Sequence, residues 1–453
     1  MPSFQSNNLI TAIFPIDPSL KSQLARGAGG AFAVKIAAMG SAFLLQVILA
    51  RILGLEGFGI YIYALTLMNF AAMFGRLGMD TASVKCVAAY HGTNDWAKLS
   101  GFISFSNTLS LSLGLLVGVA SVAVFYVIDV PEKHSLIKPI WIACLLLTPL
   151  NALIFTINAQ LRGFKCIVPS QSANDVLRPL FIILTIAILY YAAKDKVSAS
   201  VALCVHALSA TVVLTIMIIL LKKYIDLKPK EVRPIYEYRH WVLSALPFLG
   251  IAVANLVIAQ ADILMLGSLG SPIEAGLYAP ARRIGNLITI VLTSVNAIAA
   301  PLFSELYTQG KKDELQNTVR TAAKWIFLFS VPCCILVMIF AKPLLLLFGT
   351  EFQKGYQALQ IIAGAQLVNA LAGSVGFLLM MTNHQSKASL IMMVCALLNL
   401  SLNFFLIPHF GIIGAAWSNF LTTVFWNVAL LSLTLKYLRI NPTIVRLDRG
   451  FPT

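Results

Sequence analysis

Long apolar runs separated by short polar segments fill the chain from about residue 30 to about residue 437. The runs are continuous over about 20 residues or more, the length that an α-helix needs to cross a bilayer. They lack the alternating segments of about ten residues that mark membrane β-strands. Because only helices and closed barrels satisfy their backbone groups in lipid, the pattern predicts an all-α, polytopic membrane protein.

A basic stretch divides these runs into two halves of similar length. It covers residues 222–239, reads KKYIDLKPKEVRPIYEYR and carries six Lys or Arg. We predict twelve spans, six in each half, at residues 30–52, 57–78, 99–128, 136–160, 168–192, 197–221, 241–268, 276–302, 325–348, 356–381, 387–407 and 411–436. The predicted organisation is an N-terminal segment (1–29), an N-lobe (30–221), a basic linker (222–240), a C-lobe (241–437) and a tail (438–453).

The distribution of Lys and Arg predicts which side of the membrane each segment faces. Most of these residues fall on the side of the linker, and the positive-inside rule assigns that side to the cytoplasm. Because each half has an even number of spans, both termini are predicted to be cytoplasmic. Residues 1–29 are mixed and polar and do not predict a signal peptide. Residues 79–98 and 303–324 are each predicted to hold a short amphipathic helix at the cytoplasmic surface.

Composition narrows the function classes. With 58% hydrophobic residues, 11% charged residues and a mean hydropathy of +0.84, the composition of the chain differs from that of a soluble protein. The net charge of +15 lies mostly between apolar runs, where it orients the protein beside membrane lipids, so no nucleic acid partner is expected. The seven cysteines form no CxxC or Cys/His ligand spacing, and no Walker sequence is present. We therefore expect no metal, no cofactor and no ATP hydrolysis.

Two similar motifs support an internal repeat. LGLEGFGIY, with Gly54, Gly59 and Tyr61, resembles LGSPIEAGLY, with Gly270, Gly276 and Tyr278, after one inserted residue. Two six-span copies of one unit are expected to be related by an axis along the membrane normal. Short glycine-rich turns between apolar helices can also recur by chance, and this alternative stays open.

Polar residues inside the eighth span follow a helical period. Their spacings of 4, 4, 3, 4 and 3 put six side chains on one helical face: Tyr278, Arg282, Asn286, Thr289, Thr293 and Asn296. Polar groups inside a bilayer are costly and mark function or polar packing. The face is therefore expected to line a water-filled cavity or to meet polar groups of neighbouring helices.

Two acidic residues are candidates for ion coupling. Asp262 lies on the seventh span at about the depth of Arg282 and Arg283, and it forms either an ion pair between helices or a proton or cation site. Asp80 is four residues after Arg76, and these two side chains are predicted to pair.

Cations outnumber acids on spans one, two, seven and eight. These spans carry five cations against two acids, and the cations are Lys35, Arg51, Arg76, Arg282 and Arg283. A cavity with this balance suits an anionic headgroup such as a lipid diphosphate, because guanidinium groups bind phosphate oxygens in pairs. Asn286 and Asn296 complete the candidate binding set. Snorkelling of Lys35, Arg51 and Arg76 to the interface is the alternative. A weaker set comprises Asn151, Asn158, Arg162, Gln171, Asp175 and Arg178 on the fourth and fifth spans.

Three segments carry a family resemblance that extends over about residues 30–437. They are ILARILGLEGFGIY, ADILMLG followed by EAGLYAPARRI, and SKASLIMMVCALLNLSLNFFLIPHFGIIGAAWSNFL. The arrangement resembles the polysaccharide biosynthesis flippases, the O-antigen and related undecaprenyl-linked oligosaccharide translocases of the multidrug/oligosaccharidyl-lipid/polysaccharide exporter superfamily.

The resemblance implies a MATE-like fold, with two lobes around a central cavity that moves a polyprenyl diphosphate glycan by alternating access. It implies transfer from the inner to the outer leaflet of the bacterial cytoplasmic membrane, and a polysaccharide polymerase is a further candidate partner. It also implies diphosphate-binding roles for Arg282, Arg283, Arg51 and Lys35. Coupling to a proton or sodium gradient stays open.

Two other functions compete with this one. A multidrug or cation antiporter of the same superfamily would share the architecture but should favour acidic cavity residues. A membrane glycan polymerase or ligase would be an enzyme and should carry a sizeable external loop with catalytic residues. The sequence contains no such loop, so we predict a transporter rather than an enzyme.

Overall fold

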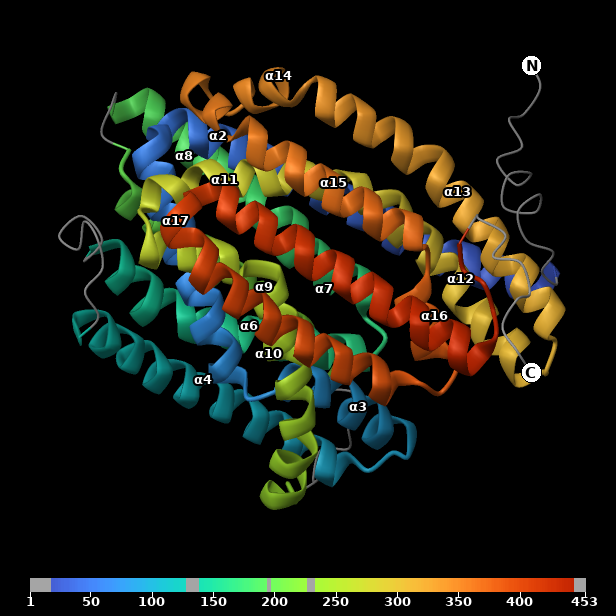
Figure 1. Ribbon diagram of the computed structural model, residues 1–453. Helices are drawn as coiled ribbons and strands as arrows, with labels where there is room; N and C mark the ends of the chain where they lie inside the picture. Colours follow the sequence, from blue (N-terminus) through green and yellow to red (C-terminus); the bar gives the residue numbers. More distant parts are fainter. Residues whose placement is uncertain (1–17, 128–137, 194–196, 226–232, 444–453) are drawn as a thin grey trace, which may run out of the picture.

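The computed structural model describes residues 18–127, 138–193, 197–225 and 233–443, and the chain is helical in these ranges, without a β-strand (Figure 1). Parts of three predicted segments, the N-terminal segment 1–29, the linker 222–240 and the tail 438–453, lie outside the described residues.

The helices form two groups that follow the order of the chain. The first group, here called the N-lobe, comprises α2 (Pro18–Arg76), α3 (Met79–Gly92), α4 (Trp96–Val127), the π-helix η1 (Ile142–Leu147), α6 (Thr148–Gly163), α7 (Ile167–Gln171), the π-helix η2 (Ser172–Leu177), α8 (Arg178–Ala193) and α9 (Ala199–Ile225). The second group, the C-lobe, comprises α10 (Tyr238–Leu269), α11 (Pro272–Gly285), the 3-10 helix η3 (Asn286–Thr289), α12 (Ile290–Thr308), α13 (Lys312–Ile339), α14 (Ala341–Leu346), the 3-10 helix η4 (Thr350–Gly355), α15 (Tyr356–Ala372), α16 (Val375–Met381), α17 (Gln385–Leu433) and the π-helix η5 (Thr434–Leu438).

The length and apolarity of the helices agree with a polytopic membrane protein. In the described part of the chain, eight helices are long and apolar enough to span a membrane, and two bent pairs raise the number to ten. Two of the eight contain one residue with a non-helical backbone, Gly54 in α2 and Gly411 in α17. The residues on either side of each kink are numerous enough for one crossing each. When each of the two kinked helices is counted as two crossings, the ten units account for the twelve predicted spans.

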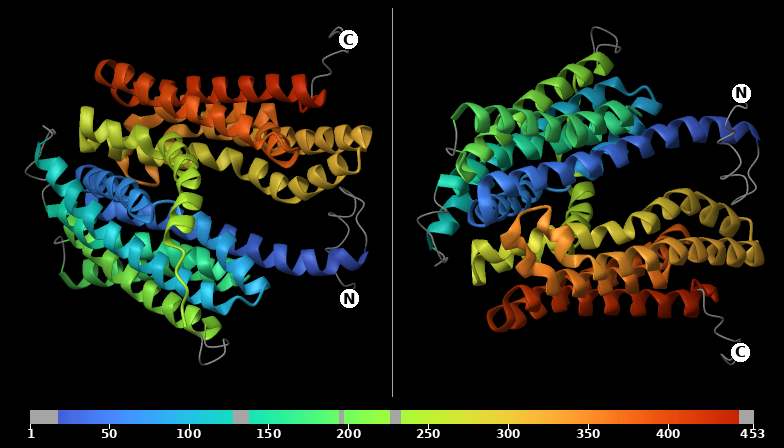
Figure 2. Two further views of the ribbon diagram at one scale, coloured as in Figure 1. Left: turned by 90° about the horizontal axis from the view of Figure 1, so that it is seen from below. Right: turned by 90° about the horizontal axis from the view of Figure 1, so that it is seen from above.

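The lobes lie on opposite sides of the molecule (Figure 2). The start of α2, the turn between α12 and α13 and the end of α17 lie at the same end, and the start of α10 reaches across to α3 of the N-lobe. Small residues let helices within a lobe approach closely: a Cβ on Gly114 of α4 would lie 2.9 Å from the Cα of Pro149 in α6. Large apolar side chains such as Leu184 and Phe405 are exposed on the outer faces, as expected where lipid surrounds a helix.

Two predictions about helix continuity differ from the structure. The segment 79–98 contains a separate helix, α3, as predicted. The prediction of a second short helix at 303–324 is wrong, because α13 begins at Lys312 and continues to Ile339. The prediction of one continuous polar face on the eighth span is also wrong, because η3 interrupts the α-helix between Gly285 and Ile290. A 3-10 turn has about 3.0 residues per turn instead of 3.6, so residues before and after it no longer share one face.

Candidate functional site

The lobes meet along α2, α10 and α11. A Cβ on Gly276 of α11 would lie 2.9 Å from the Cα of Gly59 in α2, so two helix backbones are in direct contact there. The Tyr63 hydroxyl lies 3.0 Å from Oγ of Ser268 on α10. One face of α2 therefore packs on the C-lobe through small residues and hydrogen bonds.

Arg51 lies just before the kink of α2 and reaches the other lobe. Its side chain is exposed, and Nε donates a hydrogen bond to the carbonyl oxygen of Leu347, at 2.7 Å. Aromatic contacts accompany it, with the Phe58 and Phe352 ring centroids 5.7 Å apart in an edge-on arrangement. The structure thus places this candidate cation at a contact between lobes.

Further along α2, the Asn69 amide nitrogen donates a hydrogen bond to Gln260 Oε1, at 3.2 Å. This contact again links the second half of α2 to α10. The residues of α10 that face the N-lobe are thus distinct from Asp262, which lies inside the C-lobe.

Asp262 forms a buried ion pair with Arg282, and this pair links α10 to α11. The carboxylate is fully buried, and its Oδ2 accepts a hydrogen bond from the Tyr278 hydroxyl at 2.6 Å. The Arg282 guanidinium also donates to the carbonyl oxygen of Ile258, at 2.9 Å, and its side chain is 12% exposed. Of the two interpretations of Asp262, the ion pair between helices is the one that the structure displays.

A polar pocket of about 230 Å³ opens beside Arg282 within the C-lobe. It lies between α10, α11, α15 and α17, and its lining comprises Asn255, Ile258, Arg282, Gln366, Asn369, Met392, Cys395, Asn419, Thr422, Thr423 and Trp426. Two buried lining oxygens, Oδ1 of Asn419 and Oγ1 of Thr422, have no hydrogen-bond partner among the described residues. The sequence analysis missed this pocket, because its residues come from four separated segments.

The six polar residues of the eighth span have different environments. Tyr278 is fully buried, Asn286 is exposed, and Asn296 is buried with Oδ1 unpaired in the described structure. The hydroxyls of Thr289 and Thr293 donate to backbone carbonyls three residues earlier in the chain. Only Arg282 of this set lines the C-lobe pocket.

The predicted pairing of Arg76 with Asp80 is confirmed, at 3.1 Å. The guanidinium carbon of Arg76 also lies 4.3 Å from the centroid of the Phe155 ring, which suits a cation–π contact. The two candidate acids, Asp80 and Asp262, are therefore already paired with arginines. In the described structure, Lys35, Arg51 and Arg283 have no salt bridge; Lys35 is exposed and Arg283 is half-buried.

The N-lobe contains a second polar cluster, which the sequence analysis ranked as weak. Arg178 is only 7% exposed, and its Nη1 donates to Oδ1 of Asn151, at 2.8 Å. In the same lobe, the Tyr61 hydroxyl lies 2.9 Å from Nδ1 of His206. Tyr61 and His206 were missed, since isolated aromatic residues in apolar spans give no periodic signal.

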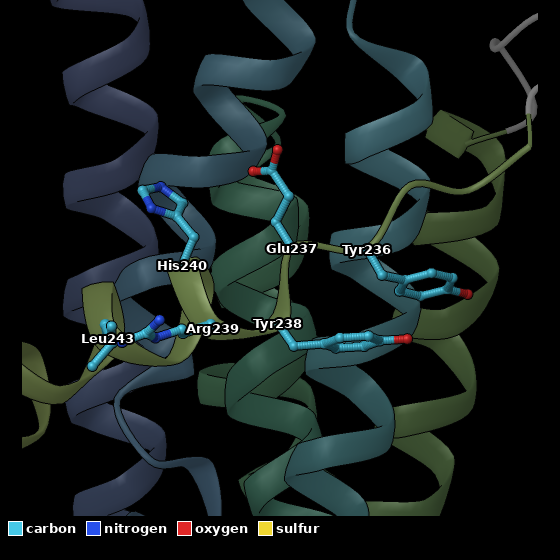
Figure 3. A pocket seen from close by; sticks show the side chains of 6 residues that line it. All are labelled: Tyr236, Glu237, Tyr238, Arg239, His240 and Leu243. Atoms are coloured by element: carbon cyan, nitrogen blue, oxygen red, sulfur yellow. The ribbon is translucent and has the colours of Figure 1, made fainter.

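The start of α10 forms an aromatic surface with the end of the linker (Figure 3). Tyr236 and Tyr238 stack with ring centroids 5.2 Å apart, while Glu237 forms a 2.8 Å salt bridge with Lys98. Trp241 donates from Nε1 to the Tyr90 hydroxyl of α3, at 2.9 Å. Burial raises the pKa of the Tyr90 phenol, and the Trp241 hydrogen bond acts in the opposite direction. The linker is thus attached to the N-lobe by defined contacts.

The described residues contain no group of three or more His, Cys, Asp or Glu that could hold a metal ion. The chemistry on display is that of hydrogen bonding and charge, with carboxamides, hydroxyls and guanidinium groups as the functional atoms.

Comparisons with known proteins agree with this architecture. A family model described as polysaccharide biosynthesis protein matches residues 24–307, and one described as MatE matches residues 247–405. A probable low-salt glycan biosynthesis flippase, Agl15 of Haloferax volcanii, is 21% identical over 41% of this chain and 39% of its own length. The succinoglycan biosynthesis transport protein ExoT of Rhizobium meliloti is 24% identical over 75% of this chain and 65% of its own length. The chain thus matches less than two thirds of either relative.

Solved structures show the same fold. An inward-facing multidrug resistance MATE family transporter of the MOP superfamily superposes with a TM-score of 0.71 at 16% identity, covering 88% of this chain and 94% of the other. Since the first family model matches well over half of the sequence, the chain belongs to the polysaccharide biosynthesis protein family.

Proposed function

We propose that this transporter carries a polyprenyl diphosphate-linked oligosaccharide, such as an undecaprenyl-linked O-antigen or other polysaccharide repeat unit, from the inner to the outer leaflet. The membrane is the bacterial cytoplasmic membrane, with both termini and the linker in the cytoplasm. A polysaccharide polymerase that receives the flipped unit is a candidate partner.

The observation that carries the proposal is the balance of unpaired charge. Asp80 and Asp262 are each paired with an arginine, whereas Lys35, Arg51 and Arg283 have no carboxylate partner in the described structure. An unpaired cation in a membrane protein is costly unless it meets an anion or water. A diphosphate headgroup would supply the missing negative charge, and guanidinium groups bind its oxygens in a planar, directed way.

The C-lobe pocket suits the sugar part of the same passenger. Its carboxamides and hydroxyls can donate and accept hydrogen bonds, and Trp426 offers an aromatic face against a sugar ring. Its volume of about 230 Å³ is below the ~300–1,000 Å³ of sites for drug-sized ligands. The pocket would therefore hold a single ring, and the rest of the glycan would remain outside it.

Alternating access would follow from the two-lobed architecture. The lobes contact each other through α2, α10 and α11, and rocking about this seam would expose the passenger to one side of the membrane at a time. Asp262 and Asp80 remain the candidates for coupling to a proton or sodium gradient. Protonation of either carboxylate would break an ion pair and leave an arginine free.

A multidrug or cation antiporter is the second candidate function, favoured by the MatE match to residues 247–405. Such a transporter needs an unpaired carboxylate to hold its cationic passenger. In the described structure both candidate acids are paired with arginine, which supports the anionic passenger.

Transport into liposomes tests the proposal. The purified protein would be reconstituted with a fluorescent polyprenyl diphosphate oligosaccharide, and the fraction that reaches the far leaflet would be followed with a membrane-impermeant quencher. Loss of one charged hydrogen bond costs about 1.5–3 kcal/mol, so Arg283→Gln should slow transport by roughly tenfold to a hundredfold. Lys311→Gln, at an exposed pair with Glu314, is the matched control and should transport normally. Normal transport by both Arg283→Gln and Lys35→Gln would contradict the proposal.

A further inference from the structure

Arg178 in the N-lobe has an unusual combination of burial and missing partners. Its side chain is 7% exposed, and Nε and Nη2 are both buried without a hydrogen-bond partner among the described residues. Only Nη1 is used, in hydrogen bonds to Oδ1 of Asn151 at 2.8 Å and of Asn174 at 3.4 Å. A buried charge is normally paired, so the free atoms of this guanidinium require an explanation.

The unpaired atoms lie on one edge of the guanidinium. Nε and Nη2 direct two parallel N–H bonds to the same side, and this fork matches two oxygens of a carboxylate or phosphate group. Asn151 occupies the other side through Nη1. The part of Arg178 that is best shaped to bind an oxyanion is therefore the part that the protein leaves free.

The acidic residue nearest in sequence does not fill this edge. Asp175 precedes Arg178 by three residues, a spacing at which helix neighbours can pair. Here Asp175 lies in the π-helix η2, is exposed, and accepts a hydrogen bond from the Asn174 amide at 2.7 Å. No salt bridge of the described residues involves Arg178.

The backbone around Arg178 is also irregular. The π-helix η2 ends at the residue before it, and a second π-helix, η1, ends four residues before Asn151. Single π-helical turns inside α-helices occur frequently at functional sites. Both helices that hold the Arg178–Asn151 contact therefore carry this local distortion.

We infer that the N-lobe contains a second anion site, in which the Nε–Nη2 edge of Arg178 binds two oxygens of a phosphoryl group while Asn151 and Asn174 hold Nη1. The hydrogen bonds that hold Arg178 all lie within the N-lobe. Its occupant is either the diphosphate of the passenger or free phosphate. The choice of a phosphoryl group rests on the proposed function. The test measures binding, so failure of transport and failure of this site can be told apart.

The experiment uses full-length protein in detergent and follows thermal unfolding during titration with inorganic phosphate and, separately, with a short-chain prenyl diphosphate. Chloride at matched ionic strength serves as the reference. A ligand that binds the folded state raises the unfolding temperature in a saturable way. We expect such a rise with at least one of the two phosphoryl probes. Saturation by inorganic phosphate alone identifies free phosphate as the source, whereas saturation only by the prenyl diphosphate identifies the headgroup of the passenger.

Variants at position 178 distinguish the contribution of the paired N–H groups to phosphate binding from that of the positive charge. Arg178→Lys keeps the charge but loses the paired N–H groups, and loss of one charged hydrogen bond should weaken binding by roughly tenfold to a hundredfold. Arg178→Met should abolish the response, and without ligand it should unfold no earlier than the original protein, because it removes an unpaired buried charge. Lys222→Gln, at an exposed lysine of α9 in the same lobe, should respond fully.

Two results would overturn the inference. The first is the absence of any saturable response to either phosphoryl probe in the unaltered protein. The second is an unchanged affinity in Arg178→Lys, which decides the question even if Arg178→Met fails to fold. Retention of the phosphate response in Arg283→Gln, with transport lost, would show that this site and the transport cations are distinct.

Discussion

Gly59 and Gly276 pack directly against each other across the lobe interface: a Cβ on Gly276 would lie 2.9 Å from the Cα of Gly59. The two glycines hold equivalent places in the motifs LGLEGFGIY and LGSPIEAGLY. The equivalent tyrosines, Tyr61 and Tyr278, are both almost completely buried and hydrogen-bonded within their own lobes. The repeated motif thus places one interface glycine and one buried tyrosine in each lobe.

A side chain at this contact should shift the balance between conformations. Gly276→Val would overpack the contact by about 1–3 kcal/mol in the state where the glycines touch, which is a population shift of about 5- to 150-fold. In a cysteine-free background, Asn69→Cys and Gln260→Cys report on the same seam, and their rate of disulfide formation should fall. Gly250→Ala, where nothing lies within 4 Å of the added Cβ, is the control and should cross-link normally. Unchanged cross-linking in Gly276→Val would mean that the seam does not open.

The Asp262–Arg282 pair should behave as one unit in stability but not in transport. Asp262→Asn or Arg282→Gln alone leaves a buried charge uncompensated and should cost about 3–5 kcal/mol of unfolding free energy. The double variant should recover most of that loss, measured by thermal unfolding in detergent. Transport should stay low in the double variant, because Arg282 also lines the C-lobe pocket.

The partly exposed pair of Arg76 and Asp80 provides the comparison for this cycle. Its side chains are 14% and 20% exposed, and Asp80→Asn should cost at most about 1 kcal/mol. Recovery of transport together with stability in the Asp262/Arg282 double variant would assign that pair a purely structural role.

Replacing the polar groups of the C-lobe pocket with apolar ones should reduce transport without loss of stability. Asn419 and Thr422 each have a buried oxygen without a partner in the described structure, so Thr422→Val removes an unsatisfied group at almost constant volume. We expect its unfolding temperature to stay equal or rise, while the initial transport rate falls several-fold. Val428→Leu on the exposed face of the same helix should change neither quantity. A normal transport rate in Thr422→Val and in Asn419→Leu would exclude the pocket as a sugar site.

The linker contact should stabilise the junction of the lobes. Trp241→Phe keeps the aromatic packing but removes the hydrogen bond to Tyr90, and a neutral hydrogen bond contributes about 0.5–1.5 kcal/mol. Limited proteolysis of the linker in membranes should become faster, since the start of α10 is held less firmly. Tyr236→Phe, at an exposed stacked ring, should be cleaved at the original rate.

The sequence alone determined the features that depend on local hydrophobicity and spacing. Continuous apolar runs are sufficient to predict membrane helices, because the bilayer sets their length. The i, i+4 spacing of Arg76 and Asp80 predicted their salt bridge, since both side chains lie on one short helical segment. The shared motif in the two halves is also read from the order of residues, and the internal repeat that it indicates stays a prediction.

Tertiary structure decided everything that depends on how distant helices are rotated and broken. The 3-10 turn at η3 divides the polar face of the eighth span, although its spacing of residues is perfectly helical. From the sequence, Asp262 could form an ion pair between helices or serve as a proton or cation site. The packing of α10 on α11 places Arg282 and Tyr278 at its carboxylate and so decides for the ion pair. The unpaired edge of Arg178 has no sequence signal at all. Whether a buried charge is satisfied depends on what other helices place around it, and hydrophobicity along the chain does not encode that arrangement.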